Sequence, residues 1–146
     1  MGLAVSIADA VATELNAAPV GTFSQQFTAA RKVLPEFGLA DLAELKVTVL
    51  PKSVEITGGT RVANTYEFAI DVGVQKKLGK DLDTDVASLG TFVDELADYL
   101  RRRSLEVGTH MLVWAGIRNE PVYAPEHLAE QRVFTSVLTV TYRMMR

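Results

Sequence analysis

The sequence predicts an α+β fold in which helices flank a single mixed or antiparallel β-sheet. Residues 66–75 alternate strictly between apolar residues and polar or small ones, which is the period of a strand with one buried face. Residues 84–103 carry apolar side chains at intervals of three and four, which is the period of an amphipathic helix. With 146 residues, 48% of them hydrophobic, the chain can enclose one core, so we expect a single domain over residues 1–146.

The composition excludes several classes of function. The chain has no cysteine, which rules out disulfides, thiolate zinc sites, iron–sulfur clusters and a cysteine nucleophile. A net charge of −3 argues against a broad nucleic-acid-binding surface. The first twelve residues lack the positive charge of a secretory signal, and no apolar run reaches the ~20 residues of a membrane helix, so we expect neither export nor membrane insertion.

The predicted order of elements is α-β-α(short)-β-β-α-β-β. Residues 6–16 show one apolar stripe and predict the first helix, with Ser6 as its N-cap. Residues 23–34 are expected to be extended, with Pro35 ending the strand. Residues 40–45 predict a short helical turn before the next strand.

The central pair of strands predicts a β-hairpin. Residues 46–57 and 61–75 flank Gly58 and Gly59, which suit a two-residue turn because both can adopt positive φ. In that register, opposed residue numbers sum to 117 and apolar residues pair with apolar residues. The distal half, residues 52–65, is too polar to cover a core and predicts a projecting arm, with an unstructured loop as the alternative. A two-stranded ribbon is marginal in water, so an ordered arm would need a surface to lie against.

The second half of the chain predicts one long helix and two more strands. Acidic residues crowd the start of the helix at 84–103 and arginines its end, which complements the helix dipole. Residues 111–117 form a short apolar strand, and Pro125 begins a helical turn. The last strand, residues 132–146, has apolar or mildly polar side chains on both faces. Something must therefore cover its second face and the edge of the sheet.

No motif predicts a catalytic residue, a cofactor or a metal ion. His110 and His127 are far apart in the sequence and neither has a ligand at helical spacing. Asp81, Asp83 and Asp85 imitate the alternate acids of a calcium loop but lack its glycine and distal glutamate, and a helix N-terminus explains them without an ion. The sequence therefore favours a role in assembly over catalysis.

Arg101, Arg102 and Arg103 form the one cationic cluster of the sequence. Compensation of the helix dipole explains them most simply. The first alternative is a surface for an acidic partner or a neighbouring subunit, and the second is a nucleic-acid contact.

Two segments resemble a family of bacteriophage proteins. The segment "NEPVYAPEHLAEQRVFTSVLTVTYR" (residues 119–143), and "YEFAIDVGVQKKL" (residues 66–78) followed by a long amphipathic helix, resemble small neck and tail proteins of long-tailed, siphovirus-like bacteriophages and prophages. The similarity is greatest to the tail terminator, or tail completion, group. The order of elements over nearly the whole chain also fits the tail-terminator fold.

The resemblance implies a structural, non-enzymatic virion protein. Tail terminators form a ring, here expected to be a hexamer, that caps the tail tube, ends its polymerisation and joins it to the head connector. The expected partners are sister copies, the tail tube protein and a connector or stopper protein, in the host cytoplasm during assembly and then in the virion. DNA would pass through the lumen without specific binding, which agrees with an acidic chain.

We expect Arg61, Val62 and Tyr66 to lie at or near an interface between subunits. The arginines at 101–103 would meet acids of an adjacent subunit or of the tube protein. Two other functions stay open: another neck component, such as a connector or stopper, and a small ligand-binding or enzymatic α+β domain. The last would need a pocket with converging polar groups.

Overall fold

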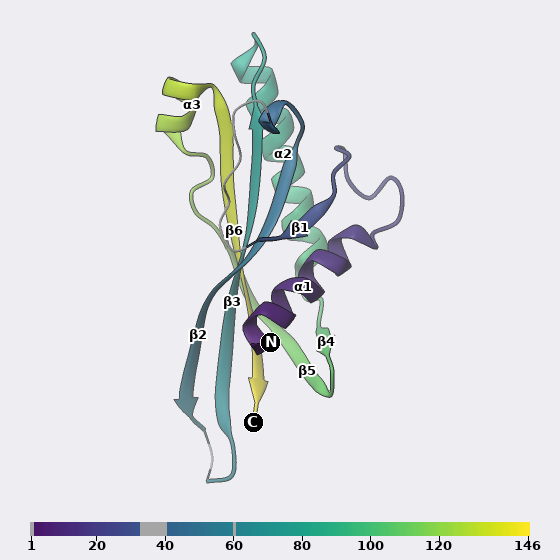
Figure 1. Cartoon of the computed structure of the whole chain (residues 1–146), viewed down its shortest axis with the longest axis vertical. Helices are drawn as coiled ribbons and strands as arrows, with labels where there is room; N and C mark the ends of the chain where they lie inside the picture. The colour runs from purple at the N-terminus through teal and green to yellow at the C-terminus, as the bar shows by residue number, and fades with distance from the viewer. Residues whose placement is uncertain (1, 33–40, 60) are drawn as a thin grey trace.

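The computed structural model describes residues 2–32, 41–59 and 61–146. Six strands form one mixed sheet in the order β1-β2-β3-β6-β5-β4, which curls into a half-barrel (Figure 1). The predicted α+β class is confirmed. In chain order the elements are α1 (Leu3–Asn16), β1 (Ala29–Arg31), the 3-10 turn η1 (Asp41–Ala43), β2 (Lys46–Gly58), β3 (Asn64–Lys77), α2 (Leu82–Leu100), β4 (Leu105–Val107), β5 (His110–Asn119), α3 (Pro125–Gln131) and β6 (Val133–Met145).

The hydrophobic core lies between α1, α2 and one face of the sheet, which we call the core face. The period-two pattern of β3 and β6 turns alternate side chains toward the helices, and Ile70, Val72 and Val140 are fully buried there. Phe92 of α2 is also fully buried and packs edge-to-face against Phe27. The predicted amphipathic helix and alternating strand thus meet along their apolar sides.

The opposite face of the sheet, which we call the outer face, carries α3 at one end. The Ala124 N–H donates to the Thr135 carbonyl at 3.0 Å, and His127 Nδ1 lies 2.9 Å from the Thr135 hydroxyl. Pro125 begins this helix, as predicted. α3 therefore covers the end of the outer face that lies far from the arm (Figure 1).

The final strand, β6, is internal to the sheet. It pairs with β3 along its whole length and with β5 between Leu138 and Arg143. Its even-numbered residues, such as Tyr142 and Met144, are buried on the core face. The two-sided character of this strand follows from its position, because both of its edges are paired and α3 covers part of its second face.

The predicted register of the β2–β3 hairpin is wrong. Val47 faces Val74 and Thr57 faces Thr65, so opposed residue numbers sum to 121 near the core and to 122 toward the tip. Near the core the shift is four residues, which leaves the alternation in phase. In that part of the hairpin apolar residues face apolar residues in either register, and pattern alone cannot choose between them.

The connection between the two strands is longer than predicted. Gly58 still belongs to β2 and pairs with Asn64, so residues 59–63 make the turn, of which Thr60 lies outside the described residues. Neither Gly58 nor Gly59 has a positive φ. A two-residue turn at this position is therefore wrong.

A β-bulge divides β2 between Pro51 and Ser53. Before the bulge, Val47 and Val49 point to the core face; beyond it, Val54 faces Phe68 and points the same way. One extra residue in one strand shifts the phase of its alternation. The bulge thus keeps the apolar side chains of the distal half on the core side of the sheet.

The predicted strand over residues 23–34 is mostly wrong. Only Ala29–Arg31 form a strand, which pairs in parallel with β2. Phe23 and Phe27 instead pack against each other edge-to-face, with ring centroids 5.3 Å apart, over the aromatic side of α2. Their interaction with a helix overrides the weak strand pattern. The predicted end at Pro35 lies outside the described residues.

Both long helices begin earlier than predicted. α1 begins at Leu3 with Gly2 as N-cap, and Ser6 lies within the first turns, so the Ser6 cap is wrong. α2 begins at Leu82 because the Asp81 carboxylate accepts hydrogen bonds from the N–H and hydroxyl of Thr84. The same hydrogen bonds lower the pKa of Asp81 below its ordinary value.

Strand β4, Leu105–Val107, is absent from the predicted order. It forms a short hairpin with the start of β5 around Gly108, whose φ of 61° lies in the left-handed region. Three residues are too few to display a period, which explains why the pattern did not reveal it.

Tyr142 places a polar hydroxyl group in the hydrophobic core. Its side chain is fully buried, and its hydroxyl has no hydrogen-bond partner among the described residues. A buried hydroxyl without a partner costs about 1–3 kcal/mol. We therefore expect Tyr142→Phe to raise the free energy of unfolding by about 1 kcal/mol at neutral pH, as measured by urea denaturation. A loss of stability would show that the hydroxyl is bonded.

The same side chain predicts a pH dependence. Burial raises the pKa of the Tyr142 phenol above its ordinary value, and the negative charge of Glu14 raises it further. An acid with a raised folded-state pKa loses stability once the pH passes its unfolded-state pKa of about 10. The wild-type protein should thus lose stability faster than Tyr142→Phe above about pH 10. Parallel pH profiles for the two proteins would contradict this assignment.

Candidate functional site

The sheet leaves part of each side unpaired. β1 covers β2 only from Val47 to Val49, and β4 covers β5 only from His110 to Leu112. Residues 52–58 of β2 therefore have no strand on the side away from β3, and residues 113–119 of β5 have none on the side away from β6, among the described residues. Unpaired strand edges present rows of N–H and C=O groups that can bind another strand. Because β2 and β5 lie on opposite sides of the sheet, one subunit carries two different open edges.

The arm, residues 52–65, is supported by a third strand of its own chain. β3 pairs with β6 as far as Thr65 and Met145, and Asn64 and Arg146 exchange two backbone hydrogen bonds of 2.7 and 2.9 Å. The expectation of a two-stranded arm that needs an external support is therefore corrected. The C-terminal strand supports the β3 side, and the β2 side remains open (Figure 1).

The core-face side of the arm is apolar and partly uncovered. Val54 is 45% exposed and Ile56 is 55% exposed, although they face Phe68 and Tyr66 on the neighbouring strand. Tyr66 is half-buried and stacks on Phe68 with ring centroids 6.2 Å apart. Tyr66, which is predicted at an interface between subunits, therefore lies on the middle strand of the arm, between Ile56 of β2 and Met144 of β6.

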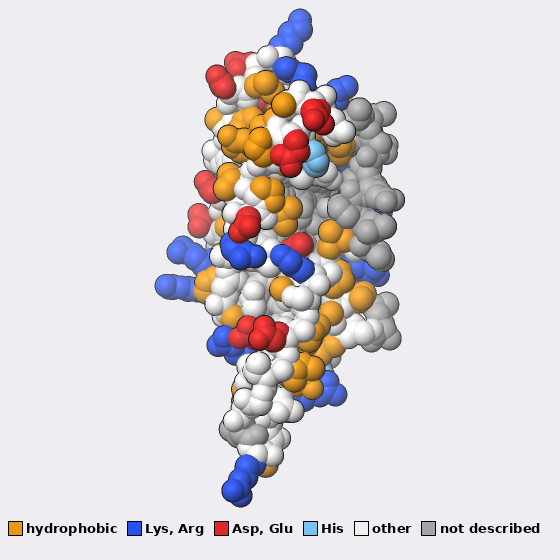
Figure 2. Space-filling view, turned by 90° about the vertical axis from the view of Figure 1, so that its left-hand side faces the viewer, with side chains coloured by type: hydrophobic (Ala, Val, Ile, Leu, Met, Phe, Trp, Pro, Cys, Tyr) orange, Lys and Arg blue, Asp and Glu red, His pale blue; other side chains and the backbone are white. Residues whose placement is uncertain are grey.

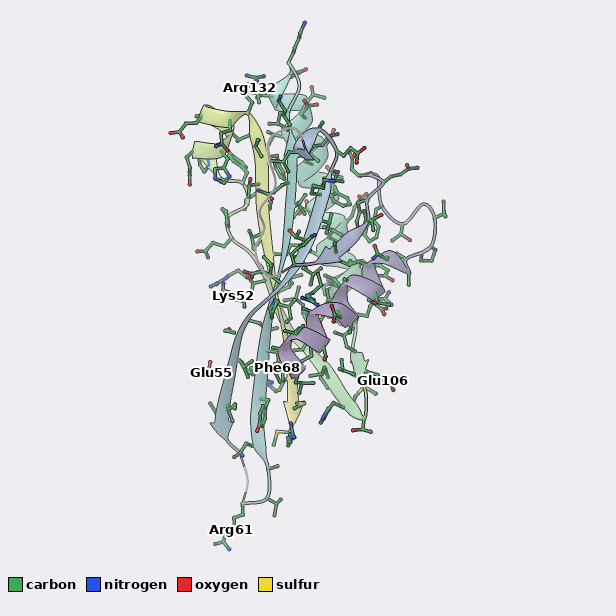
Figure 3. The ribbon with its side chains drawn as sticks, viewed as in Figure 1. Lys52, Glu55, Arg61, Phe68, Glu106 and Arg132 are labelled. Atoms are coloured by element: carbon green, nitrogen blue, oxygen red, sulfur yellow. The ribbon has the colours of Figure 1, made fainter. Side chains whose placement is uncertain are left out.

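The tip of the arm carries the other two predicted interface residues. Arg61 is exposed and projects from the end of the hairpin, where Figure 3 labels it. The Val62 side chain is 92% exposed. A valine side chain and a cation thus extend beyond the body of the subunit. Tyr66 follows Val62 by four residues and lies within β3, so the three residues form a line along the arm rather than a cluster.

The outer face carries charges of both signs across its middle. Figure 2 looks onto this side and shows charged side chains between an apolar region near α3 and the narrow arm. Asp71 accepts a hydrogen bond of 2.6 Å from Thr139 and lies 4.0 Å from Lys52 Nζ. Arg143 pairs with Glu67 at 2.7 Å. These contacts join β2, β3 and β6 across the face.

The three consecutive arginines do not share one role. They follow α2 instead of ending it, since Arg101 is the C-cap and Arg102 has a φ of 62°. Arg103 binds inside the subunit: its Nη1 lies 2.9 Å from Glu14 Oε1, and its guanidinium lies 4.0 Å from the Tyr99 ring centroid. Of the cluster, Arg101 and Arg102 are exposed without a partner among the described residues. The arm and this cluster are not brought together (Figure 1).

The described residues hold no group of three or more His, Cys, Asp or Glu side chains that could bind a metal ion. Within the same residues, no helix has the length and apolar character to cross a bilayer. The surface hollows are open. One of about 590 Å³ lies beside the start of β2, and one of about 380 Å³ lies on the outer face between Lys52 and Arg118.

Comparison with known proteins finds a solved structure with a similar fold. No protein-family model and no curated protein matches the sequence. A chain in the solved structure of the virion of a native gene transfer agent (GTA) particle has a similar fold, with a TM-score of 0.59 and 15% sequence identity. The match covers 99% of this chain and 100% of that chain. The likeness therefore extends over the whole architecture, although the sequences have diverged widely.

The arginine cluster gives a prediction that separates its members. Arg103→Ala removes the ion pair with Glu14 and the contact with Tyr99, so we expect it to lower the free energy of unfolding by about 1 kcal/mol. Arg101→Ala removes no side-chain hydrogen bond or ion pair to the described residues and should change the free energy of unfolding by less than about 0.5 kcal/mol. Thermal and urea denaturation of the two variants check this difference. Equal effects would show that the contacts of Arg103 contribute little.

Proposed function

We propose that this protein is a structural, non-enzymatic component of a phage-like virion, and that it forms a closed ring of identical subunits. The fold likeness to a chain of a gene transfer agent virion over the full length of both chains is the observation that carries the proposal. The open edges of the sheet give it a physical basis, because a subunit with unpaired edges is complete only when another strand covers them.

The position of the open edges supports a ring. They lie on opposite sides of the sheet and differ in sequence, so a contact between them is heterologous. Heterologous contacts repeat from subunit to subunit and form a ring when the rotation closes. We propose a hexamer that caps the tail tube, ends its polymerisation and joins it to the head connector.

The proposed partners are sister copies, the tail tube protein and a connector or stopper protein. The ring would assemble in the host cytoplasm and remain in the virion. Arg101 and Arg102 are free to meet acids of a neighbour, and Arg61 and Val62 extend far enough to contact one. DNA would pass through the lumen without specific binding, since the chain has a net charge of −3 and phosphates gain little from such a surface.

The second candidate is another neck component, such as a connector or stopper. The likeness to a virion chain favours it equally, because it identifies the kind of particle and not the position within it. Purified tail tubes distinguish the two. A terminator should bind to the tube end and stop its growth, whereas a stopper should bind the connector and leave tube growth unchanged. Negative-stain electron microscopy of the mixtures gives the answer.

The arm supplies the test of assembly. Removing residues 54–64 leaves Ser53 about 13 Å from Thr65, since four strand positions separate their partners. A five-residue Gly/Ser linker spans that distance and leaves the β3–β6 pairing in place. We expect this variant to stay monomeric at concentrations where the full-length protein forms rings, as measured by native mass spectrometry.

A second variant keeps the strands of the arm and changes only its tip, where Arg61 and Val62 are proposed to contact a neighbour, so it should weaken assembly less than removal of the arm. Arg61→Ala with Val62→Ser leaves the strands of β2 and β3 intact. Circular dichroism should show the same folded content in both variants. If the linker variant still forms the complete ring, the arm has no part in assembly.

A further inference from the structure

The two open edges of the sheet carry charges in the same order along the chain, with a cation before an anion. Along β2, the cation Lys52 precedes the anion Glu55; in β5, the cation Arg118 precedes the anion Glu120, which directly follows the strand. A parallel alignment of the four charges places like charge beside like charge. An antiparallel alignment places Glu55 opposite Arg118 and brings Lys52 near Glu120, so complementarity selects the antiparallel direction.

The faces of the two edges match as well. Glu55 faces Glu67 and Arg118 faces Thr139, so both belong to the outer face. Ile56 faces Tyr66, and Ile117 faces Val140 on the core face. With Glu55 opposite Arg118, Ile56 stands opposite Ile117. A one-residue slip in either direction would place Ile117 opposite Glu55 or Thr57, both of which belong to the outer face, so the match defines a register.

We propose that β2 of one subunit pairs antiparallel with β5 of the next subunit. Val54, Glu55, Ile56 and Thr57 then face Asn119, Arg118, Ile117 and Gly116 of the second copy. The inference rests on the proposed ring and identifies the contact that closes it. Two strands of neighbouring subunits would merge the sheets into one continuous sheet around the ring, and the exposed apolar side of the arm would become covered.

The charges that form this contact are available in the single subunit. Arg118 lies 3.7 Å from Glu120, and its side chain is 65% exposed; Lys52 lies 4.0 Å from Asp71. Exposed pairs at such distances contribute little to stability. Exchanging them for partners in a neighbouring subunit therefore costs little, and Figure 3 shows Lys52 and Glu55 projecting from the side of the sheet away from α1.

The absence of cysteine from the chain permits a direct test of the register. Directly opposed residues in an antiparallel pair have Cβ atoms about 4.5–5.5 Å apart, close enough for a disulfide after slight adjustment. We expect the double variant Ile56→Cys with Ile117→Cys to form a covalent ladder under mild oxidation, seen on a non-reducing gel. Its largest band should contain the number of subunits in the ring, and reduction should return every band to monomer.

The control pair places one thiol on the other face. Thr57 belongs to the outer face, opposite in direction to Ile117. Thr57→Cys with Ile117→Cys should therefore give no ladder. Each single cysteine variant should stay monomeric on the gel because the residue opposite its thiol in the next subunit is not a cysteine.

Charge reversal supplies the second measurement. Glu55→Arg and Arg118→Glu should each weaken assembly at least about tenfold, because each places like charges opposite one another. The double reversal restores opposite charges and should return the assembly constant to within about threefold of wild type. Sedimentation velocity measures the constant, and circular dichroism shows that each variant is folded.

The outcomes separate this inference from the proposed function. A ladder or restored assembly supports the β2–β5 contact. If the wild-type protein forms rings but the Ile56–Ile117 pair gives no ladder and the double reversal restores nothing, the ring uses another surface and this inference is wrong. If the wild-type protein stays monomeric at high concentration and beside tail tubes, both the inference and the ring are overturned.

Discussion

The backbone groups along the open edges of the sheet are the constraint on which the rest of the structure depends. A strand edge must find hydrogen-bond partners in the chain, in water or in another molecule. The strands at the two ends of the sheet, β1 and β4, have only three residues each, and they lie beside β2 and β5, which have 13 and 10 residues. Most of each edge is therefore left to solvent or to a neighbour.

The internal strands explain why the arm is ordered. β3 and β6 pair continuously from Lys77 and Val133 to Thr65 and Met145. An isolated hairpin would be marginal in water, but a third strand with buried side chains stabilises it. Phe68, Tyr142 and Met144 bury the base of the arm against the core. The arm is thus an extension of the body of the sheet, and its rigidity follows from β6.

The long, strongly periodic elements could be predicted from the sequence, and the short ones could not. α2 and the strands β3 and β6 carry enough residues for their period to be unambiguous. β1 and β4 are strands because they pair with β2 and β5. Phe23 and Phe27 are placed by an aromatic contact in the tertiary structure, which the local sequence pattern does not indicate. The hairpin register failed because even shifts preserve the alternation of faces.

The position of the β-bulge in β2 is indicated by the sequence pattern. In β2 the apolar residues stand at odd positions, Val47 and Val49, and then at even positions, Val54 and Ile56. A strand that keeps one face buried can change phase in this way only by gaining or losing one residue. The candidate interface residues could not be located so well. Their pattern places Arg61 and Tyr66 on one hairpin, but only the register shows that Tyr66 lies within the sheet and Arg61 at the tip.

An open strand edge can also pair with unrelated strands and cause aggregation. Residues on the open edge of β2 limit such pairing. Pro51 cannot donate a backbone hydrogen bond, the bulge interrupts the ladder at Lys52, and a charge follows at Glu55. Natural edge strands use these features against aggregation. In the proposed β2–β5 contact, they leave a short stretch that would accept a strand with the opposite order of charges. The curvature of the half-barrel would then rotate each added subunit of the proposed ring in the same direction, which favours closure over an extended stack.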